Sequence, residues 1–341
     1  MTVKVTKPAI NVRSELADLR KPTGIAGEAM LRAETTQEQF QLIGAGRRNM
    51  VINGGFTVWQ RSTAGAAGSG FTMDAADRWY SVRGAMSREY ENSVPYCHMV
   101  HGNFADSCYI NHRVEDFAHT LGKQVTISYK IKSDDGLGAD GGIFIRYYNS
   151  SNAYTTALTS STYVYGSDWT TVTYTFTMPT TAPKVGYGLE FFLYGDLNSV
   201  NNNGKSFDVK EVQLEVGKVA TPFEHRSYGE ELALCQRYYH KWTSDAAYNF
   251  VAMGYAYQAT GANHIYHFPV TMRVKPTQFA SSGTWRVCSD GCINNVSISA
   301  GSYNTNSVTI TVTTSGLTAG LAYMLGDANN ANSEISWDAE L

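Results

Sequence analysis

The sequence predicts a mainly β protein, in which a short helical N-terminal segment precedes two antiparallel β-sandwich domains of the jelly-roll type. Over several segments apolar and polar residues alternate, as in residues 125–132, which is the period of a strand with one buried face. Clusters of Gly, Asn, Ser and Asp separate these segments, as turns do in a sandwich. Helical spacing of apolar residues is concentrated in the first 46 residues.

The first 46 residues are predicted to form short helices. Val12, Leu16 and Leu19 recur at the spacing of one helical face, and Thr35 with Glu38 forms a capping-box pattern. Helices of about two turns are marginal alone in water, so this segment is expected to dock on another protein. The residues expected to make that contact are Leu16, Leu19, Met30, Leu31, Phe40, Arg47 and Arg48.

Residues 47–226 are predicted to form the first sandwich. The alternating segments 125–132 and 171–178 each present one apolar face and one polar face. A third segment, 187–193, also alternates, but Phe192 and Tyr194 make its second face apolar too. Many antiparallel strands joined by such turns favour a jelly roll.

Residues 227–341 are predicted to form a second, smaller β-sandwich that begins with a helix. Residues 230–242 place Leu232, Cys235, Tyr239 and Trp242 near one stripe of an amphipathic helix. Alternating strands are expected to follow at 265–270, 284–287, 296–298, 308–312 and 335–337.

Composition excludes several classes of protein. The net charge of −3 does not indicate a broad nucleic-acid surface. No apolar run reaches the roughly 18 residues that cross a bilayer, so membrane insertion is not expected. The cysteine count is five, without a secretory signal, which favours free thiols; a metal half-site at Cys288 and Cys292 is the less favoured alternative.

Motifs of enzymes are absent from the sequence. It contains no nucleophile elbow, no zinc-protease helix, no P-loop and no dinucleotide-binding glycine pattern, so the protein is predicted not to be an enzyme. Asp134, Asp135 and Asp140 form an acidic loop whose spacing differs from a calcium-binding loop, which favours a solvated turn.

An excess of aromatic residues among Asn, Ser and Thr indicates glycan contact. The C–H faces of sugars stack on aromatic rings, and their hydroxyls pair with amides and hydroxyls. The alternative is that these rings pack on half-buried sheets or at subunit contacts. The candidate glycan-binding residues are Tyr147, Tyr148, Tyr154, Tyr163, Tyr165 and Trp169.

Several short motifs resemble virion proteins of bacteriophages. Residues 49–56, 59–63 and 76–79 resemble the opening of β-sandwich modules in phage tail fibres, and residues 207–224 resemble the closing strand of those modules. Residues 21–32 are similar to the virion-anchoring start of tail fibres in marine podoviruses. The resemblance implies a homotrimeric fibre that contacts tail or adaptor proteins.

The middle zone also resembles carbohydrate-binding modules of the jelly-roll kind. That resemblance implies a structural calcium near the two ends of the module, where Asp208 matches the Asp of the final strand. Thr57 stands where an acidic ligand would follow Phe56, which departs from the pattern. No other cofactor is expected.

Together these observations predict a tail fibre in the virion, made in the host cytoplasm and anchored by its N-terminus. Its β-domains would contact host surface polysaccharide, and several weak contacts would add up by avidity. The alternatives are a purely structural capsid or tail decoration protein, and a polysaccharide depolymerase.

Overall fold

The computed structural model describes residues 48–104, 107–115, 117–133, 141–148, 154–180, 188–194, 204–329 and 332–340. The chain divides into two compact units, Met1–Arg48 and Asn49–Leu341, and all the sheets belong to the second. The predicted N-terminal helices, with anchor candidates Leu16, Leu19, Met30, Leu31, Phe40 and Arg47, lie outside the described residues, as does the acidic loop 134–140.

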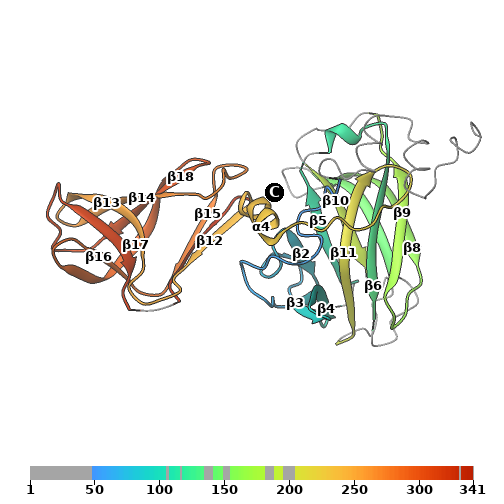
Figure 1. Cartoon of the computed structure of the whole chain (residues 1–341), viewed down its shortest axis with the longest axis horizontal. Helices are drawn as coiled ribbons and strands as arrows, with labels where there is room; N and C mark the ends of the chain where they lie inside the picture. The colour runs from blue at the N-terminus through green and yellow to red at the C-terminus, as the bar shows by residue number, and fades with distance from the viewer. Residues whose placement is uncertain are drawn as a thin grey trace, which may run out of the picture. The chain divides into compact units, whose positions relative to one another are not determined.

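Two antiparallel sheets form a sandwich, as predicted (Figure 1). The six-stranded sheet has the order β1-β2-β5-β10-β7-β8, with bounds Phe71–Thr72, Trp79–Val82, Tyr109–Val114, Leu189–Tyr194, Gly141–Tyr148 and Tyr154–Tyr163. The five-stranded sheet has the order β3-β4-β11-β6-β9, with bounds Gly84–Glu91, Val94–His101, Ser206–Val216, Gln124–Lys132 and Thr170–Thr177. The chain crosses repeatedly between the sheets, which is the connectivity of a jelly roll.

The core of the sandwich lies between the inner faces of the two sheets. On β6 the apolar residues Val125, Ile127 and Tyr129 are buried in it, which confirms the alternation predicted for this strand. Trp79 and Phe191 enter the same core from the six-stranded sheet. A 3-10 turn, η1 (Ala118–Thr120), precedes β6.

The resemblance motifs join the two ends of the sandwich. The amide of Asn49 donates to the carbonyl of Val212 at 3.0 Å, and its Oδ1 accepts from Leu214 N at 3.1 Å. The backbone N–H of Asn53 donates to Glu231 at 2.6 Å. These buried bonds satisfy backbone groups of irregular segments, so the motif residues have a structural role.

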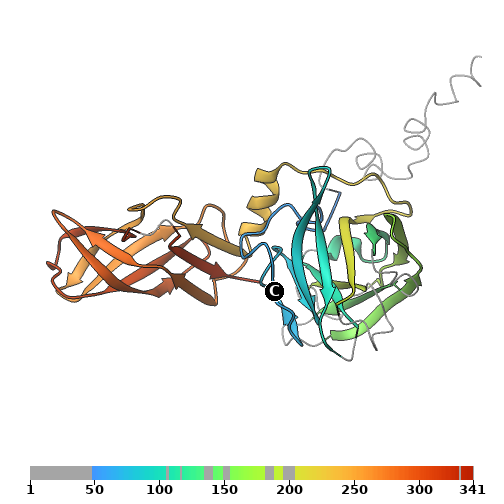
Figure 2. The same cartoon turned by 90° about the horizontal axis from the view of Figure 1, so that it is seen from below.

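The C-terminal region is a closed barrel with a small sheet beside it, which corrects the predicted second sandwich (Figure 2). The barrel order is β13-β14-β18-β17-β16-β19, with bounds Phe250–Gln258, Gly261–His267, Ser307–Thr313, Cys292–Tyr303, Trp285–Cys288 and Ala322–Asp327. The three-stranded sheet is β12-β20-β15, with bounds Tyr239–Thr243, Glu334–Asp338 and Gln278–Ser282. Alternation predicted strands correctly at β14, β16, β17, β18 and β20, but it cannot distinguish a closed ring from two layers.

The helix α4 (Tyr228–Gln236) is shorter than predicted. Ser227 and Glu230 form a capping box at its start. The expectation of helix to residue 242 is wrong, because Tyr239 and Trp242 belong to β12, where they pair with β20. The aromatic residues of this stretch favour a strand once a partner strand is available. No helix in the described part of the chain is long and apolar enough to span a membrane.

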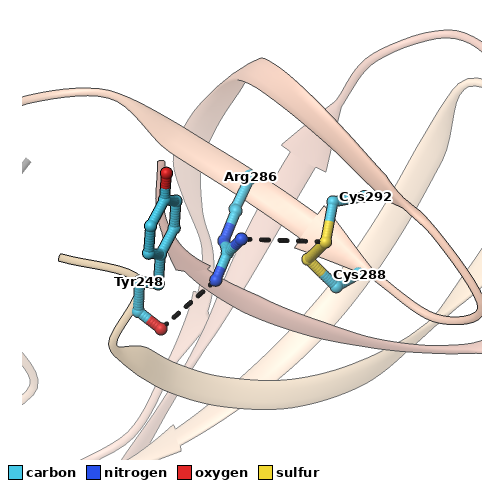
Figure 3. Close-up of a disulfide and its surroundings, with 4 residues drawn as sticks. All are labelled: Tyr248, Arg286, Cys288 and Cys292. Atoms are coloured by element: carbon cyan, nitrogen blue, oxygen red, sulfur yellow. Dashed lines mark hydrogen bonds between the residues drawn. A yellow bond between two sulfur atoms is a disulfide. The ribbon is translucent and has the colours of Figure 1, made fainter. Parts of the chain in front are cut away.

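Cys288 and Cys292 form a disulfide across the β16–β17 hairpin (Figure 3). This corrects the prediction of free thiols at this pair and the alternative of a metal half-site, because the two sulfur atoms are bonded to each other. Beside the bond, Arg286 Nη1 lies 3.8 Å from the Sγ of Cys292, and its Nη2 donates to the Tyr248 carbonyl at 3.3 Å (Figure 3). The cysteines that are free and buried are Cys97, Cys108 and Cys235.

Candidate functional site

Aromatic rings cover part of the outer face of the six-stranded sheet. Four residues on adjacent strands lie in register: Tyr80 on β2, Asn111 on β5, Phe192 on β10 and Phe144 on β7. All four point to the side of the sheet opposite to the core. The rings form a continuous set, with centroids 5.2 Å apart for Tyr109 and Phe192 and 5.8 Å apart for Phe144 and Phe192. We call this surface the aromatic face; its rings are Phe71, Tyr80, Tyr109, Phe144, Phe192 and Tyr194.

The aromatic face is partly open to solvent. Phe71 is 43% exposed and lies with its centroid 6.0 Å from Tyr80. Tyr109, Phe144 and Tyr194 are half-buried. Rings that are exposed in this way on a sheet offer flat apolar area at little cost in conformational entropy.

A buried carboxylate organises the polar groups of the aromatic face. Glu190 is fully buried, and its Oε1 accepts from the Asn111 amide at 2.5 Å and from Arg113 Nε at 3.1 Å. Its Oε2 accepts from Arg146 Nε at 2.6 Å. The Arg146 guanidinium lies 4.3 Å from the ring centroid of Phe192. Charge-assisted bonds of this kind fix the arginines in place over the rings.

The tyrosine hydroxyls of the aromatic face stay protonated at neutral pH. Burial raises the pKa of Tyr194 to about 12. Burial also raises the pKa of Tyr109, although the positive charge of Arg83 partly opposes the shift. Arg113 Nη1 donates to the Tyr80 hydroxyl at 3.2 Å. Protonated phenols are hydrogen-bond donors as well as acceptors, which suits contact with hydroxyl and carboxylate oxygens.

Asn111 leaves one polar atom without a partner in the described part of the chain. Its amide nitrogen donates to Glu190, but its Oδ1 is buried and accepts no hydrogen bond there. An unmet buried acceptor costs free energy unless a donor arrives.

The predicted glycan candidates whose side chains the structure describes do not gather at one site. Tyr147 and Tyr165 are each 4% exposed and lie in the sandwich core. Tyr163 packs against that core, and its hydroxyl donates to the carbonyl of Tyr194 at 3.0 Å. Tyr148 and Tyr154 pair in register between β7 and β8, but their side chains lie outside the described part of the chain.

Trp169, the sixth candidate, lies with a charged cluster of the five-stranded sheet. Its Nε1 donates to Glu91 Oε2 at 2.6 Å, and the Lys210 ammonium lies 3.8 Å from its ring centroid. Tyr96 contacts its edge at 5.6 Å. The ring therefore holds a salt-bridge cluster together.

Asp208, the predicted calcium ligand, belongs to the same sheet and has a histidine and a lysine as neighbours. One oxygen lies 2.6 Å from His98 Nδ1 and the other lies 3.5 Å from Lys132 Nζ. Among the described residues, no group of three His, Cys, Asp or Glu side chains is placed to hold a metal ion. The calcium at Asp208 stays a prediction.

Sequence reasoning missed most of the aromatic face. One signal was visible, because Phe192 and Tyr194 made the second face of their strand apolar. A similar signal lay in residues 109–113, where Tyr109, Asn111 and Arg113 alternate with buried Ile110 and His112. Only the pairing of β5 with β10 joins the two strands into one surface.

The barrel carries a second exposed surface, which is apolar. On β13, Met253 is 68% and Tyr255 55% exposed, and Ile265 on β14 is 55% exposed. Met253 pairs with both Ile265 and Met324 in register. Apolar patches of this kind occur at contacts between proteins.

No protein-family model matches the chain, and no curated protein matches it. Solved structures similar to it include a family 4 carbohydrate-binding module (16% identity, TM-score 0.33), which matches over 48% of this chain and 98% of its own. The CBM22-1 xylan-binding domain of Paenibacillus barcinonensis Xyn10C also matches (13% identity, TM-score 0.31), over 42% of this chain and 87% of its own.

A third similar structure is the enzymatically active domain of tailspike protein 4 from bacteriophage CBA120. It is 11% identical with a TM-score of 0.33, over 50% of this chain and 21% of its own. Likenesses at these identities and TM-scores assign no ligand to this chain, so the functional argument depends on the aromatic face.

Proposed function

We propose that the chain binds a glycan on the aromatic face of its sandwich. The observation that carries the proposal is the combination, on one outer sheet face, of six rings with arginine, glutamate and asparagine side chains. A sandwich usually turns polar residues outward, so large rings on this side are not needed for the core.

The geometry suits the two kinds of contact that a sugar makes. The half-open rings of Phe71, Tyr109 and Tyr194 provide apolar area for C–H faces. The protonated hydroxyls of Tyr109 and Tyr194 donate to ring or hydroxyl oxygens.

As the biological setting we propose a tail fibre in a phage virion. In this proposal the first 46 residues attach the chain to a tail or adaptor protein, and the aromatic face contacts host surface polysaccharide without cutting it. The motifs that resemble tail fibres support the setting. Homotrimers would multiply weak contacts, and burial of the apolar barrel surface around Met253 and Tyr255 would stabilise them.

Phe71→Ala tests the proposed face. Because Phe71 is 43% exposed, its removal should leave the fold intact while it removes stacking area. We expect affinity for host-surface polysaccharide to fall about tenfold, equivalent to about 1.4 kcal/mol, in calorimetric titration of the full chain. The matched control is Phe250→Ala on the barrel, where the ring is 45% exposed.

Three other outcomes would contradict parts of the proposal. Equal affinity of Phe71→Ala and the unchanged chain for the polysaccharide would show that the binding site lies elsewhere. Absence of binding to any surface glycan, with particles that assemble normally, would favour the decoration protein. New reducing ends in the incubated polysaccharide would show a depolymerase.

A further inference from the structure

The barrel disulfide joins one buried and one exposed cysteine. Cys288, at the end of β16, is 4% exposed, whereas Cys292, at the start of β17, is exposed. The turn at residues 289–291 that connects them is exposed as well. A small molecule in solution therefore meets the pair on the side of Cys292. Access of this kind decides which sulfur takes part in thiol exchange.

An arginine lies against the exposed cysteine (Figure 3). Arg286 Nη1 lies 3.8 Å from the Sγ of Cys292, and its Nη2 donates to the carbonyl of Tyr248 at 3.3 Å. The guanidinium also lies 4.4 Å from the ring centroid of Tyr248 and 5.2 Å from that of Phe250. These contacts hold a positive charge beside the sulfur. In the part of the chain that the structure describes, no carboxylate forms an ion pair with Arg286.

The other three cysteines lack this setting. Cys97, Cys108 and Cys235 are buried. Burial raises the pKa of Cys108 to about 12, and it raises the pKa of Cys97 and of Cys235 well above the usual range. These three side chains therefore stay protonated thiols at neutral pH, which are poor nucleophiles.

We propose that the Cys288–Cys292 pair is a site of thiol–disulfide exchange with small thiols and disulfides, in which Cys292 supplies the reactive sulfur and Arg286 stabilises its thiolate. The thiolate is the nucleophile in such exchange, and a neighbouring guanidinium favours the thiolate over the thiol. The proposal does not depend on glycan binding, because the pair belongs to the barrel and not to the sandwich.

The exchange balances with a small disulfide, such as glutathione disulfide, as the oxidant. In the reduced pair, the Cys292 thiolate attacks one sulfur of the small disulfide, so that a mixed disulfide forms and one small thiolate leaves. Cys288, after loss of its proton to water, attacks the Sγ of Cys292. The protein disulfide forms, and the second small thiolate leaves. The pair is oxidised by two electrons, and the small disulfide becomes two thiols that take up the two protons. Small thiols reverse the sequence.

Rates of alkylation test which sulfur is reactive. The full chain is reduced with dithiothreitol, freed of the reductant and treated with iodoacetamide at pH 7, and modified cysteines are located by peptide mass spectrometry. We expect Cys292 to react about tenfold faster than each of the other four cysteines. Circular dichroism of the reduced chain checks that it stays folded. A rate at Cys288 equal to or above that at Cys292 would overturn the proposal.

Variants of Arg286 test the source of the reactivity. Arg286→Gln should slow alkylation of Cys292 about tenfold at pH 7, whereas Arg286→Lys should keep part of the rate because the charge remains. At pH 10 the difference should disappear, because the thiolate then forms without help. Arg88→Gln, on β3 of the sandwich, is the control and should change nothing. An unchanged rate in Arg286→Gln, or the same loss at both pH values, would overturn the role of Arg286.

Capture of glutathione tests the exchange itself. Reduced Cys288→Ser, incubated with glutathione disulfide, should keep one glutathione on Cys292, because the second attack cannot occur. Reduced Cys292→Ser should keep much less, and the unchanged chain should return to its internal disulfide. Greater capture by Cys292→Ser would overturn the assignment of the reactive sulfur. Absence of capture in both variants, with an unchanged chain that stays reduced, would overturn the exchange site.

Discussion

The two outer faces of the sandwich enclose one core but carry different chemistry. On the five-stranded sheet, β6 turns Thr126, Ser128 and Lys130 outward, and its charges are paired with neighbours on the same sheet. On the six-stranded sheet, β10 turns Glu190 and Phe192 outward, and both are buried. An outward polar strand needs no further explanation, whereas an outward aromatic ring that stays 43% exposed, as Phe71 does beside Phe192, is apolar area available for contact.

The largest expected difference between the faces is in stability. Glu190→Gln removes the carboxylate that Arg113 and Arg146 share in a buried setting, so we expect a loss of about 3 kcal/mol in the free energy of unfolding. Glu91→Gln, in the charged cluster of the other sheet, should have a smaller effect because the Glu91 side chain is 36% exposed. Urea unfolding measures both, and equal losses would show that the faces do not differ in this way.

A smaller difference is expected at alkaline pH. The pKa of Tyr194 is raised from 10.0 to about 12, so the folded state holds its proton while the unfolded state releases it. Stability therefore falls as pH rises past 10, by about 1.4 kcal/mol at pH 11 for this group. The stability difference between the unchanged chain and Tyr194→Phe should shift by that amount between pH 9 and pH 11. A constant difference would contradict the burial of this hydroxyl.

The smallest effect is expected at Trp169. Trp169→Phe removes the hydrogen bond to Glu91 but keeps an aromatic ring in the cluster. We expect a slight loss of stability and unchanged affinity for glycan, measured by calorimetry beside Phe71→Ala. A tenfold loss of affinity would instead place the glycan at Trp169, which the sequence named among its glycan candidates.

The sequence was most informative where one strand face met the core. The alternation in residues 125–132 and 171–178 predicted β6 and β9 because each strand has one buried side. The aromatic face was not predictable in the same way, because β5 and β10 are neighbours only through long-range pairing, with Arg113 and Glu190 separated by 77 positions. The high density of tyrosines along this part of the chain led to Tyr147 and Tyr165 as glycan candidates, but their rings lie in the core.

The two wrong predictions in the C-terminal region, a helix that reaches residue 242 and a second sandwich, have the same cause. Tyr239 and Trp242 fit a helical stripe, but pairing with Glu334–Asp338 makes them a strand. That partner comes almost a hundred residues later, and the ring closure of β13 with β19 joins residues about seventy positions apart. Local patterns determine which faces are apolar, whereas distant partners decide how those faces are assembled.

The closed barrel has a consequence for how copies of the chain meet. Each of its six strands has a neighbour on both sides, so its backbone offers no row of unpaired N–H and C=O groups. Copies therefore cannot add to one another strand by strand at the barrel, which is the route by which exposed β edges polymerise into fibrils. Where many such barrels lie side by side, exposed side chains such as Met253 and Tyr255 would contact one another. The closed backbone of each barrel would at the same time prevent strand pairing between copies.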